Sequence, residues 1–305
     1  YAAPAEGHEV SLSFAHQEAD DVLYPGLRMD AAYDDTDRLV LGWVHEPSRG
    51  RFEAFHASVY GTWVDHWMVD SLRTTSEGAP RGWSMGTMAT TQLHGDTLTA
   101  EAGALTLGVE AYARSWDVWT EMAGMGYMRQ FSLPDADLEV VGVSADYRIG
   151  VDGSTWVDLA ARVDHASSSA DPTKANTDLY WAYHGTRALA RDDTMPAASV
   201  RLRHRLGPGL DLGIGLTHSR RAPDPRERYF ALKRMGADWV GDPELNPPRA
   251  TGVSLAAEWT GGRGGLVLDA HWDRIDDFIT VLGVDRIHQA PGVMNTLARS
   301  WQNVD

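Results

Sequence analysis

The chain has 305 residues, of which 43% are hydrophobic and 23% charged, a composition that excludes a collagen, a coiled coil and an extended disordered segment. Its 27 Lys and Arg stand against 43 Asp and Glu, and the net charge of −16 would repel phosphate backbones, so nucleic acid is not expected as a partner. Cysteine is absent, which excludes disulfides and thiolate metal sites and leaves His, Met and carboxylates as metal ligands.

Strict two-residue alternation is the main structural signal. In residues 210–218 the even positions from Leu210 to Leu216 are large and apolar, while the odd positions carry Asp, Gly or Thr, which predicts a strand with one apolar and one polar face. In chain order, paired strands are predicted at 39–45 with 52–64, 138–149 with 156–165, 200–206 with 210–218, and 253–259 with 266–275. About twelve strands follow, many longer than the usual length of about five to six residues, as a tilted membrane barrel requires. No apolar run of about 18 residues occurs, so no transmembrane helix is predicted.

Connections of two lengths alternate along the chain. Short turns are predicted at about 46–50, 101–103, 150–154, 207–209 and 261–265, and long connections at about 67–83, 120–136, 167–195, 222–248 and 281–291. Short turns at one rim and long loops at the other are the layout of an outer-membrane barrel. We therefore predict an all-β protein, an antiparallel transmembrane β-barrel with no helix. A soluble β-sandwich is the alternative, although it would keep its turns short at both ends.

Tryptophan is frequent, with 12 residues in the chain. Several lie near predicted strand ends, where outer-membrane barrels carry aromatic girdles at the headgroup layers. These are Trp43, Trp63, Trp116, Trp119, Trp156, Trp259 and Trp272. The alternative is that they fill the core of a sandwich.

Three motifs late in the chain carry a family resemblance. Residues 221–229 read RAPDPRERY, residues 241–248 read GDPELNPP and residues 275–279 read IDDFI. In this order and spacing they resemble the late barrel of TonB-dependent outer-membrane receptors, in which R-A-P-x-x-x-E-R-Y, G-N-P-x-L-x-P-E and I-x-D-F-I occur. The chain departs from that pattern at Asp242, where Asn is usual, and at Pro248, where Glu is usual.

Two earlier motifs look like the copper receptor subfamily typified by OprC and NosA. They are ADDVLYPGLRMD at residues 19–30, and VDHWM at residues 64–68 followed by SLR at 71–73. In that subfamily a His-x-Met pair on the barrel joins a Cys and a Met of the plug domain to hold copper. On this sequence the pair falls on His66 and Met68, and the plug's ligands have no counterpart.

The resemblance also implies domain organisation, location and partners. Residues 1–305 correspond to a partial β-barrel domain, an open piece with about 12 strands of a barrel of about 22, without the plug domain and the closing strands. Such a receptor resides in the outer membrane of a Gram-negative bacterium, in contact with outer-membrane lipid, and is expected to be a monomer. It receives energy from the TonB–ExbB–ExbD system through the plug.

His66 and Met68 are two residues apart, so on a strand they project from the same face and can address one ion. A soft thioether favours Cu(I) over Cu(II), whereas imidazole accepts both. Two ligands rarely hold copper tightly, so further ligands are expected from elsewhere. Without the family resemblance, ordinary packing is the simpler interpretation of an isolated His-x-Met pair.

Further methionines lie in or beside the predicted long loops, where apolar residues are not expected. Those assigned to capture of the metal are Met85, Met88, Met122, Met125 and Met128, and Met195 and Met235 are placed in later loops at the same rim. Methionine usually fills apolar gaps, so clustering in polar loops suggests a surface for a soft metal. Flexible loop packing is an equally good explanation.

No motif of a hydrolase, a nucleotide-binding protein or a dinucleotide-binding enzyme is present, so neither enzymatic activity nor an organic cofactor is expected. The predicted function is import of copper ions across the outer membrane, with copper as the transported ligand. One alternative is a receptor for a metal chelate such as a siderophore or cobalamin, which would show aromatic and Arg-rich loop pockets. The other is a soluble carbohydrate-binding sandwich.

Overall fold

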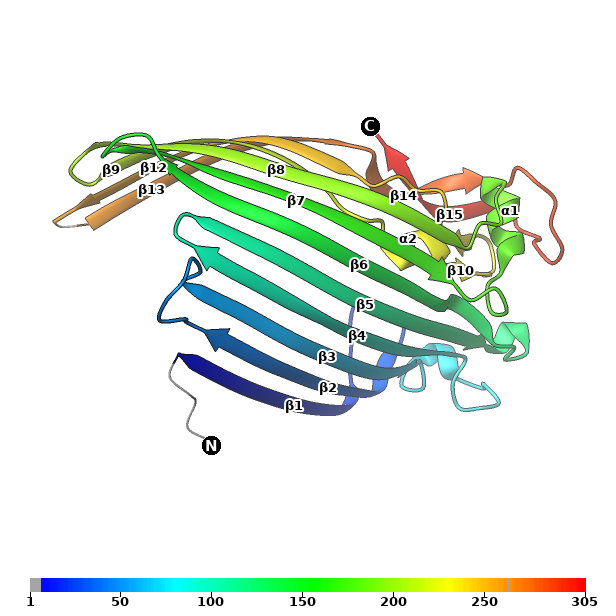
Figure 1. The fold of residues 1–305 in the computed structure, drawn as a ribbon. Helices are drawn as coiled ribbons and strands as arrows, with labels where there is room; N and C mark the ends of the chain where they lie inside the picture. The colour runs from blue at the N-terminus through cyan, green and yellow to red at the C-terminus, as the bar shows by residue number, and fades with distance from the viewer. Residues whose placement is uncertain (1–6, 263) are drawn as a thin grey trace.

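The computed structural model describes residues 7–262 and 264–305, and its main element is one curved sheet of 11 antiparallel strands (Figure 1). Residue 263, in the turn predicted at 261–265, lies outside the described residues. The strands are β1 (His8–Val22), β2 (Asp30–His45), β3 (Ala54–Val69), β4 (Met85–Ala102), β5 (Leu105–Met122), β6 (Gln130–Gly150), β7 (Thr155–Ala170), β8 (Ala190–Gly207), β9 (Leu210–Arg220), β12 (Arg249–Gly261) and β13 (Gly264–Asp276). They pair in chain order, and β9 pairs with β12. The sheet is open between β1 and β13, which confirms the predicted antiparallel barrel as an unclosed wall.

The two faces of this wall follow the alternation of the sequence. On β3, Ala57, Val59 and Trp63 lie on one face and Ser58 and Tyr60 on the other, and the side chain of Val59 is 57% exposed. The register of the strand pairs places exposed apolar residues on the same face in every strand: Leu12, Leu41, Val59, Leu98, Val109, Val143, Leu159, Val200, Ile214, Leu255 and Leu268. A band of exposed apolar side chains is the lipid-facing surface of an outer-membrane barrel, and the polar face lines the lumen.

The two ends of the wall differ, as predicted. Short turns join the strands at one end, and the long connections gather at the other with a second sheet of four short strands (Figure 1). This second sheet consists of β10 (Ala231–Leu232), β11 (Asp238–Val240), β14 (Phe278–Asp285) and β15 (Leu297–Val304). The end with the long connections is the extracellular end by the usual layout of such barrels.

The prediction that the chain has no helix is wrong. The extracellular connections contain α1 (Thr177–His184), α2 (Pro225–Tyr229) and the 3-10 turns η1 (Thr74–Ser76) and η2 (Ala123–Met125). Helix α2 begins with Pro225 after the N-cap Asp224, which forms a capping box with Glu227. Two-residue alternation indicates strands only, so it could not reveal short helices within the long loops. No helix among the described residues is long and apolar enough to cross a membrane.

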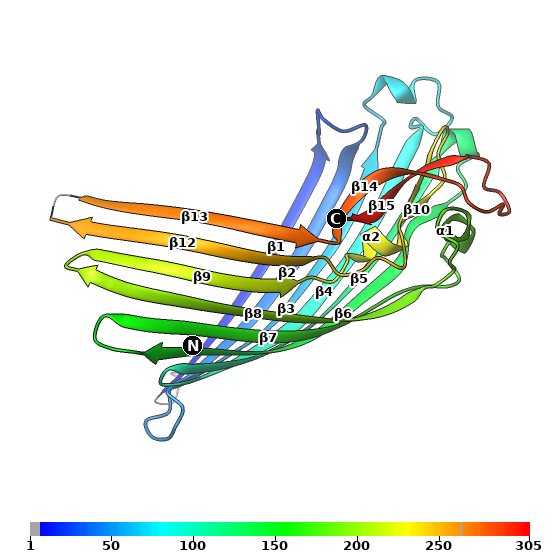
Figure 2. The same cartoon turned by 90° about the horizontal axis from the view of Figure 1, so that it is seen from above.

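Both helices and the second sheet pack at the extracellular end on the lumenal side of the wall (Figure 2). The Tyr229 hydroxyl, at the end of α2, donates to the backbone carbonyl of Ser168 on β7 at 3.0 Å, and Tyr180 of α1 is fully buried. The neighbouring Arg228 is also fully buried and contacts Asp193 of β8 at 2.7 Å. The RERY motif, residues 226–229, thus fixes a long loop to the lumenal face of the wall.

Three sequence predictions about single side chains are corrected by the strand register. Trp116 and Trp156 lie on the lumenal face, opposite Thr91 and Arg203 respectively, so they are not part of an outward girdle. Met195 lies within β8 and is buried rather than in a loop. Composition locates a strand end without specifying which face a tryptophan takes. The Met195 prediction is wrong for another reason, because β8 already begins at Ala190, inside the connection predicted at 167–195.

Candidate metal site and extracellular mouth

His66 and Met68 lie on the lumenal face at the extracellular end of β3. The Nδ1 atom of His66 is 2.7 Å from Oδ2 of Asp34 on the adjacent strand β2, and the two side chains are 21% and 25% exposed. The Thr36 hydroxyl donates to the other oxygen of Asp34 at 3.3 Å. When Nδ1–H donates to Asp34, the imidazole is held in the tautomer that leaves the Nε2 lone pair available for a metal ion.

Asp34 was not predicted from the sequence, although it is the residue that orients His66. It lies 32 positions before His66 and is its cross-strand partner on β2. Alternation places Asp34 on the polar face of β2, but only the strand register shows that it lies opposite His66. Among the described residues, no group of three or more His, Asp and Glu side chains is placed to hold a metal ion.

Two of the predicted capture methionines lie on the face that carries this pair. Met68 is opposite Thr87 of β4, and Met85 lies two residues from Thr87, so it shares the lumenal face. Met122 on β5 is the cross-strand partner of Met85. The thioethers of Met122, Met85 and Met68 therefore lie on one face of three adjacent strands, between the rim and His66.

Met88 lies on the opposite, outward face. It is the partner of Trp67 on one side and of Trp119 on the other, and its sulfur accepts a hydrogen bond from the Tyr33 hydroxyl at 3.4 Å. A contact of sulfur with aromatic side chains is a favourable packing interaction. The structure therefore separates Met88 from the other methionines assigned to metal capture.

Met125 and Met128 line a separate hollow of about 370 Å³ at the extracellular end. Lys174 lines it too, and its ammonium group lies 3.0 Å from Asp117 and 3.4 Å from Asp135. The hollow thus combines thioethers with a cation that is already neutralised by carboxylates. The structure does not bring these two methionines to His66.

A second hollow at this end, of about 390 Å³, is lined by Arg28, Arg234 and Arg299 together with Met235 and Trp239. The sequence did not predict it, because its residues come from the β1–β2 connection, from residues 234–239 and from β15. Nothing in their spacing signals that they meet.

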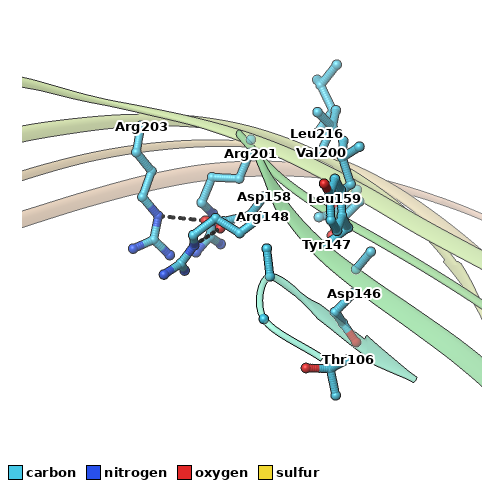
Figure 3. A pocket seen from close by; sticks show the side chains of 16 residues that line it. Thr106, Asp146, Tyr147, Arg148, Asp158, Leu159, Val200, Arg201, Arg203 and Leu216 are labelled. Atoms are coloured by element: carbon cyan, nitrogen blue, oxygen red, sulfur yellow. Dashed lines mark hydrogen bonds and ion pairs between the residues drawn. The ribbon is translucent and has the colours of Figure 1, made fainter. Parts of the chain in front are cut away.

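Nearer the periplasmic end, arginines line the lumenal face of β6–β8 around a hollow of about 500 Å³ (Figure 3). Asp158 lies 2.6 Å from Arg148 and 3.1 Å from Arg203. Arg205 pairs with Asp211 of β9 at 3.0 Å. Arg148, Arg203 and Arg205 are therefore each paired with a carboxylate of a neighbouring strand.

The comparisons with known proteins agree with this architecture. The family model described as "TonB dependent receptor-like, beta-barrel" matches residues 6–305. The chain belongs to this family. Membership places the chain in the outer membrane of a Gram-negative bacterium, in a class of receptors that work with TonB. No curated protein matches the chain.

Solved structures with the same fold include receptors for different cargoes. Copper transporter OprC is similar over 99% of this chain and 47% of its own, with a TM-score of 0.76 and 19% identity. A double mutant of the Serratia marcescens hemophore receptor HasR matches over 97% and 47%, with a TM-score of 0.64 and 13% identity. The alcaligin receptor FauA from Bordetella pertussis matches over 99% and 46%, with a TM-score of 0.53 and 13% identity. The chain thus spans about half the length of these receptors, and at such identities the likeness concerns the fold.

Proposed function

We propose that this chain is the barrel portion of a receptor that imports copper across the outer membrane. The observation that supports this most is the arrangement of Asp34, His66 and Met68, in which a carboxylate 2.7 Å from Nδ1 orients an imidazole beside a thioether on the lumenal face. Imidazole with thioether is a donor set that suits Cu(I). Further ligands come from parts of the receptor outside this chain.

The positions of the Met122 and Met85 thioethers support transfer of the metal ion from the extracellular rim toward His66. They lie nearer the extracellular rim than Met68 on the same face, so a soft metal ion meets them first. The receptor acts as a monomer in contact with outer-membrane lipid, and TonB with ExbB and ExbD supplies the energy. The role assigned to the chain is transport, with no catalytic step and no organic cofactor.

The decisive measurement is Cu(I) stoichiometry and affinity on the complete receptor in detergent. We expect wild type to retain about one copper ion, and the His66→Ala, Met68→Ala double variant to lose it, because both donors are removed. Met88→Leu is the matched control, since Met88 faces outward and its loss should leave copper binding unchanged. Equal copper retention by wild type and the double variant would overturn the proposal.

A second variant tests the orienting role of Asp34. Asp34→Asn keeps the size of the side chain but removes the charge that fixes His66, and we expect copper affinity to fall about 10- to 100-fold. A merely structural role of Asp34 would lower thermal stability and leave the affinity of the folded receptor intact.

A further inference from the structure

Four rings form a near-parallel stack at the periplasmic end of the wall, where β1 begins and β2 ends (Figure 1). His8 and His45 are cross-strand partners, and their ring centroids lie 4.0 Å apart at an interplanar angle of 12°. Trp43 stacks on His8 at 5.9 Å, and Phe55 stacks on His45 at 6.3 Å. We call these four residues the ring stack. His8 lies four residues before Leu12 on the same face of β1, so the ring stack faces outward.

The ring stack continues the lipid-facing apolar band at its periplasmic edge. Val10 is the next residue on this face of β1, and its side chain is 64% exposed, as expected for contact with lipid. Aromatic residues at such an edge are common in outer-membrane barrels, because they suit the headgroup layer. Two imidazoles in stacking contact differ from ordinary aromatics, since each of their nitrogens requires a polar partner. The neighbouring groups at this level of the membrane are lipid headgroups.

The contacts of the two imidazoles determine where each neutral ring carries its proton. The indole Nε1–H of Trp43 donates to Nδ1 of His8 at 3.2 Å, so His8 carries its proton on Nε2. Nδ1 of His45 lies 3.0 Å from the carbonyl oxygen of Gly7, which only accepts, so His45 has its lone pair on Nε2. The Gly7 carbonyl also accepts from the Glu46 amide at 2.8 Å, which holds it in place. In the part of the chain that the structure describes, neither Nε2 atom has a hydrogen-bond partner.

The ring stack therefore offers one N–H donor and one nitrogen acceptor on rings 4.0 Å apart. This arrangement does not suit a metal ion, which needs a lone pair from each ligand, because Nε2 of His8 is protonated. A phosphodiester supplies an acceptor for His8, and a primary ammonium group supplies a donor for His45. The faces of Trp43 and Phe55 also favour a cation.

One kind of membrane lipid joins these two groups through only two carbons. We propose that the ring stack binds the headgroup of a phosphatidylethanolamine in the periplasmic leaflet of the outer membrane. His8 donates to the phosphate, and His45 accepts from the ammonium group. This lipid site is independent of the proposed copper import.

The test is native mass spectrometry of the complete receptor with equal amounts of dioleoylphosphatidylethanolamine and dioleoylphosphatidylcholine. The two lipids share their acyl chains and phosphate, but the choline group has no N–H to donate. We expect wild type to retain the ethanolamine lipid over the choline lipid by about fivefold. His45→Phe should remove this preference, because the acceptor is lost. His8→Phe should lower retention of both lipids and keep the preference, because both carry the phosphate.

His56→Phe is the matched control. His56 lies at the same end of β3 on the lumenal face, 3.6 Å from Glu101, so its loss should change neither retention nor preference. Phe keeps a ring in the stack, and far-UV circular dichroism checks that each variant keeps its β structure. Loss of the preference in His45→Phe but not in His56→Phe supports the proposal. Equal retention of the two lipids by wild type overturns it, as does a preference that persists in His45→Phe. No copper is present in this measurement, so its result does not depend on the His66 site.

Discussion

The extracellular and periplasmic ends of the same wall are stabilised in different ways. At the extracellular end, two helices and a second sheet form a small core on the lumenal face, with Tyr180, Arg228 and Tyr229 fully buried. At the periplasmic end, short turns join the strands, and ion pairs such as Arg205–Asp211 are largely exposed. The periplasmic end is stabilised mainly by the hydrogen bonds between strands, whereas the extracellular end is packed like a globular domain. A packed end can hold the arginine hollow and the strand ends of the candidate metal site in fixed positions.

The largest expected effect is at the buried pair of the packed end. Arg228 and Asp193 are 1% and 5% exposed, so Arg228→Met leaves an uncompensated carboxylate inside the protein. Removing one partner of a buried pair typically costs about 3–5 kcal/mol. We expect the midpoint of urea unfolding of the complete receptor to fall accordingly. Arg228→Met combined with Asp193→Leu should recover most of the loss, and a double variant as unstable as the single one would show that the pair's charge is not the cause.

The second prediction compares two aspartates, Asp70 and Asp152, that stabilise turns at opposite ends of the wall. Asp70 is fully buried beside the extracellular connection and accepts hydrogen bonds from the amides of Ser84 and Met85, at 2.7 and 3.0 Å, and from the hydroxyl of Thr75 at 2.7 Å. Burial raises its pKa, but these hydrogen bonds outweigh burial and hold the pKa below its usual value. We expect Asp70→Ala to cost about 1–3 kcal/mol, because buried donors lose their acceptor.

Asp152 in a periplasmic turn is the comparison for Asp70. It accepts from the amide and hydroxyl of Ser154, at 2.7 and 2.9 Å, and these bonds lower its pKa to about 2. Its turn is exposed, so water can replace the lost acceptor in Asp152→Ala. A protease should therefore cleave residues 71–83 of the Asp70→Ala variant far faster than residues 151–154 of the Asp152→Ala variant. Equal cleavage of both turns would contradict the difference drawn between the two ends.

A pH-dependent effect is expected at the packed end. His184 at the end of α1 is buried, which lowers its pKa, while Asp242 and Glu244 partly oppose the shift; its Nε2 lies 3.0 Å from the Ser300 hydroxyl. Because the folded state favours the neutral imidazole, its contribution to stability is complete above the ordinary value of 6.5 and is lost as the pH falls below that value. The protection factors of the α1 amides, which correct for the slower intrinsic exchange at low pH, should therefore fall at pH 5.5 relative to pH 7.5, and His184→Gln should remove that fall.

The same contrast explains what could be predicted from the sequence. Alternation is a local property, so it located the strands and their two faces. The lengths of the connections predicted the asymmetry of the ends, and the three late motifs at 221–229, 241–248 and 275–279 indicated the family. The packed end brings distant segments together: Arg228 pairs with Asp193, and Arg28 and Arg299 line the same hollow. The orientation of His66 depends on Asp34, which the register of β2 and β3 brings opposite it. His66 and Met68 could thus be predicted as a pair, whereas the role of Asp34 became apparent only from the strand register.

The smallest effect is expected at the exposed periplasmic pair. Arg205 and Asp211 are 54% and 38% exposed, and exposed ion pairs typically contribute about 0.2–1 kcal/mol because water screens them. Arg205→Ala should shift the unfolding midpoint only slightly, and the shift should vanish in high salt. Arg205 also lies over Trp156 at 5.7 Å, so Arg205→Met, which keeps that contact, should be closer to wild type than Arg205→Ala. A loss as large as that of Arg228→Met would mean that the periplasmic end is stabilised by its side chains as well, and that the two ends do not differ in kind.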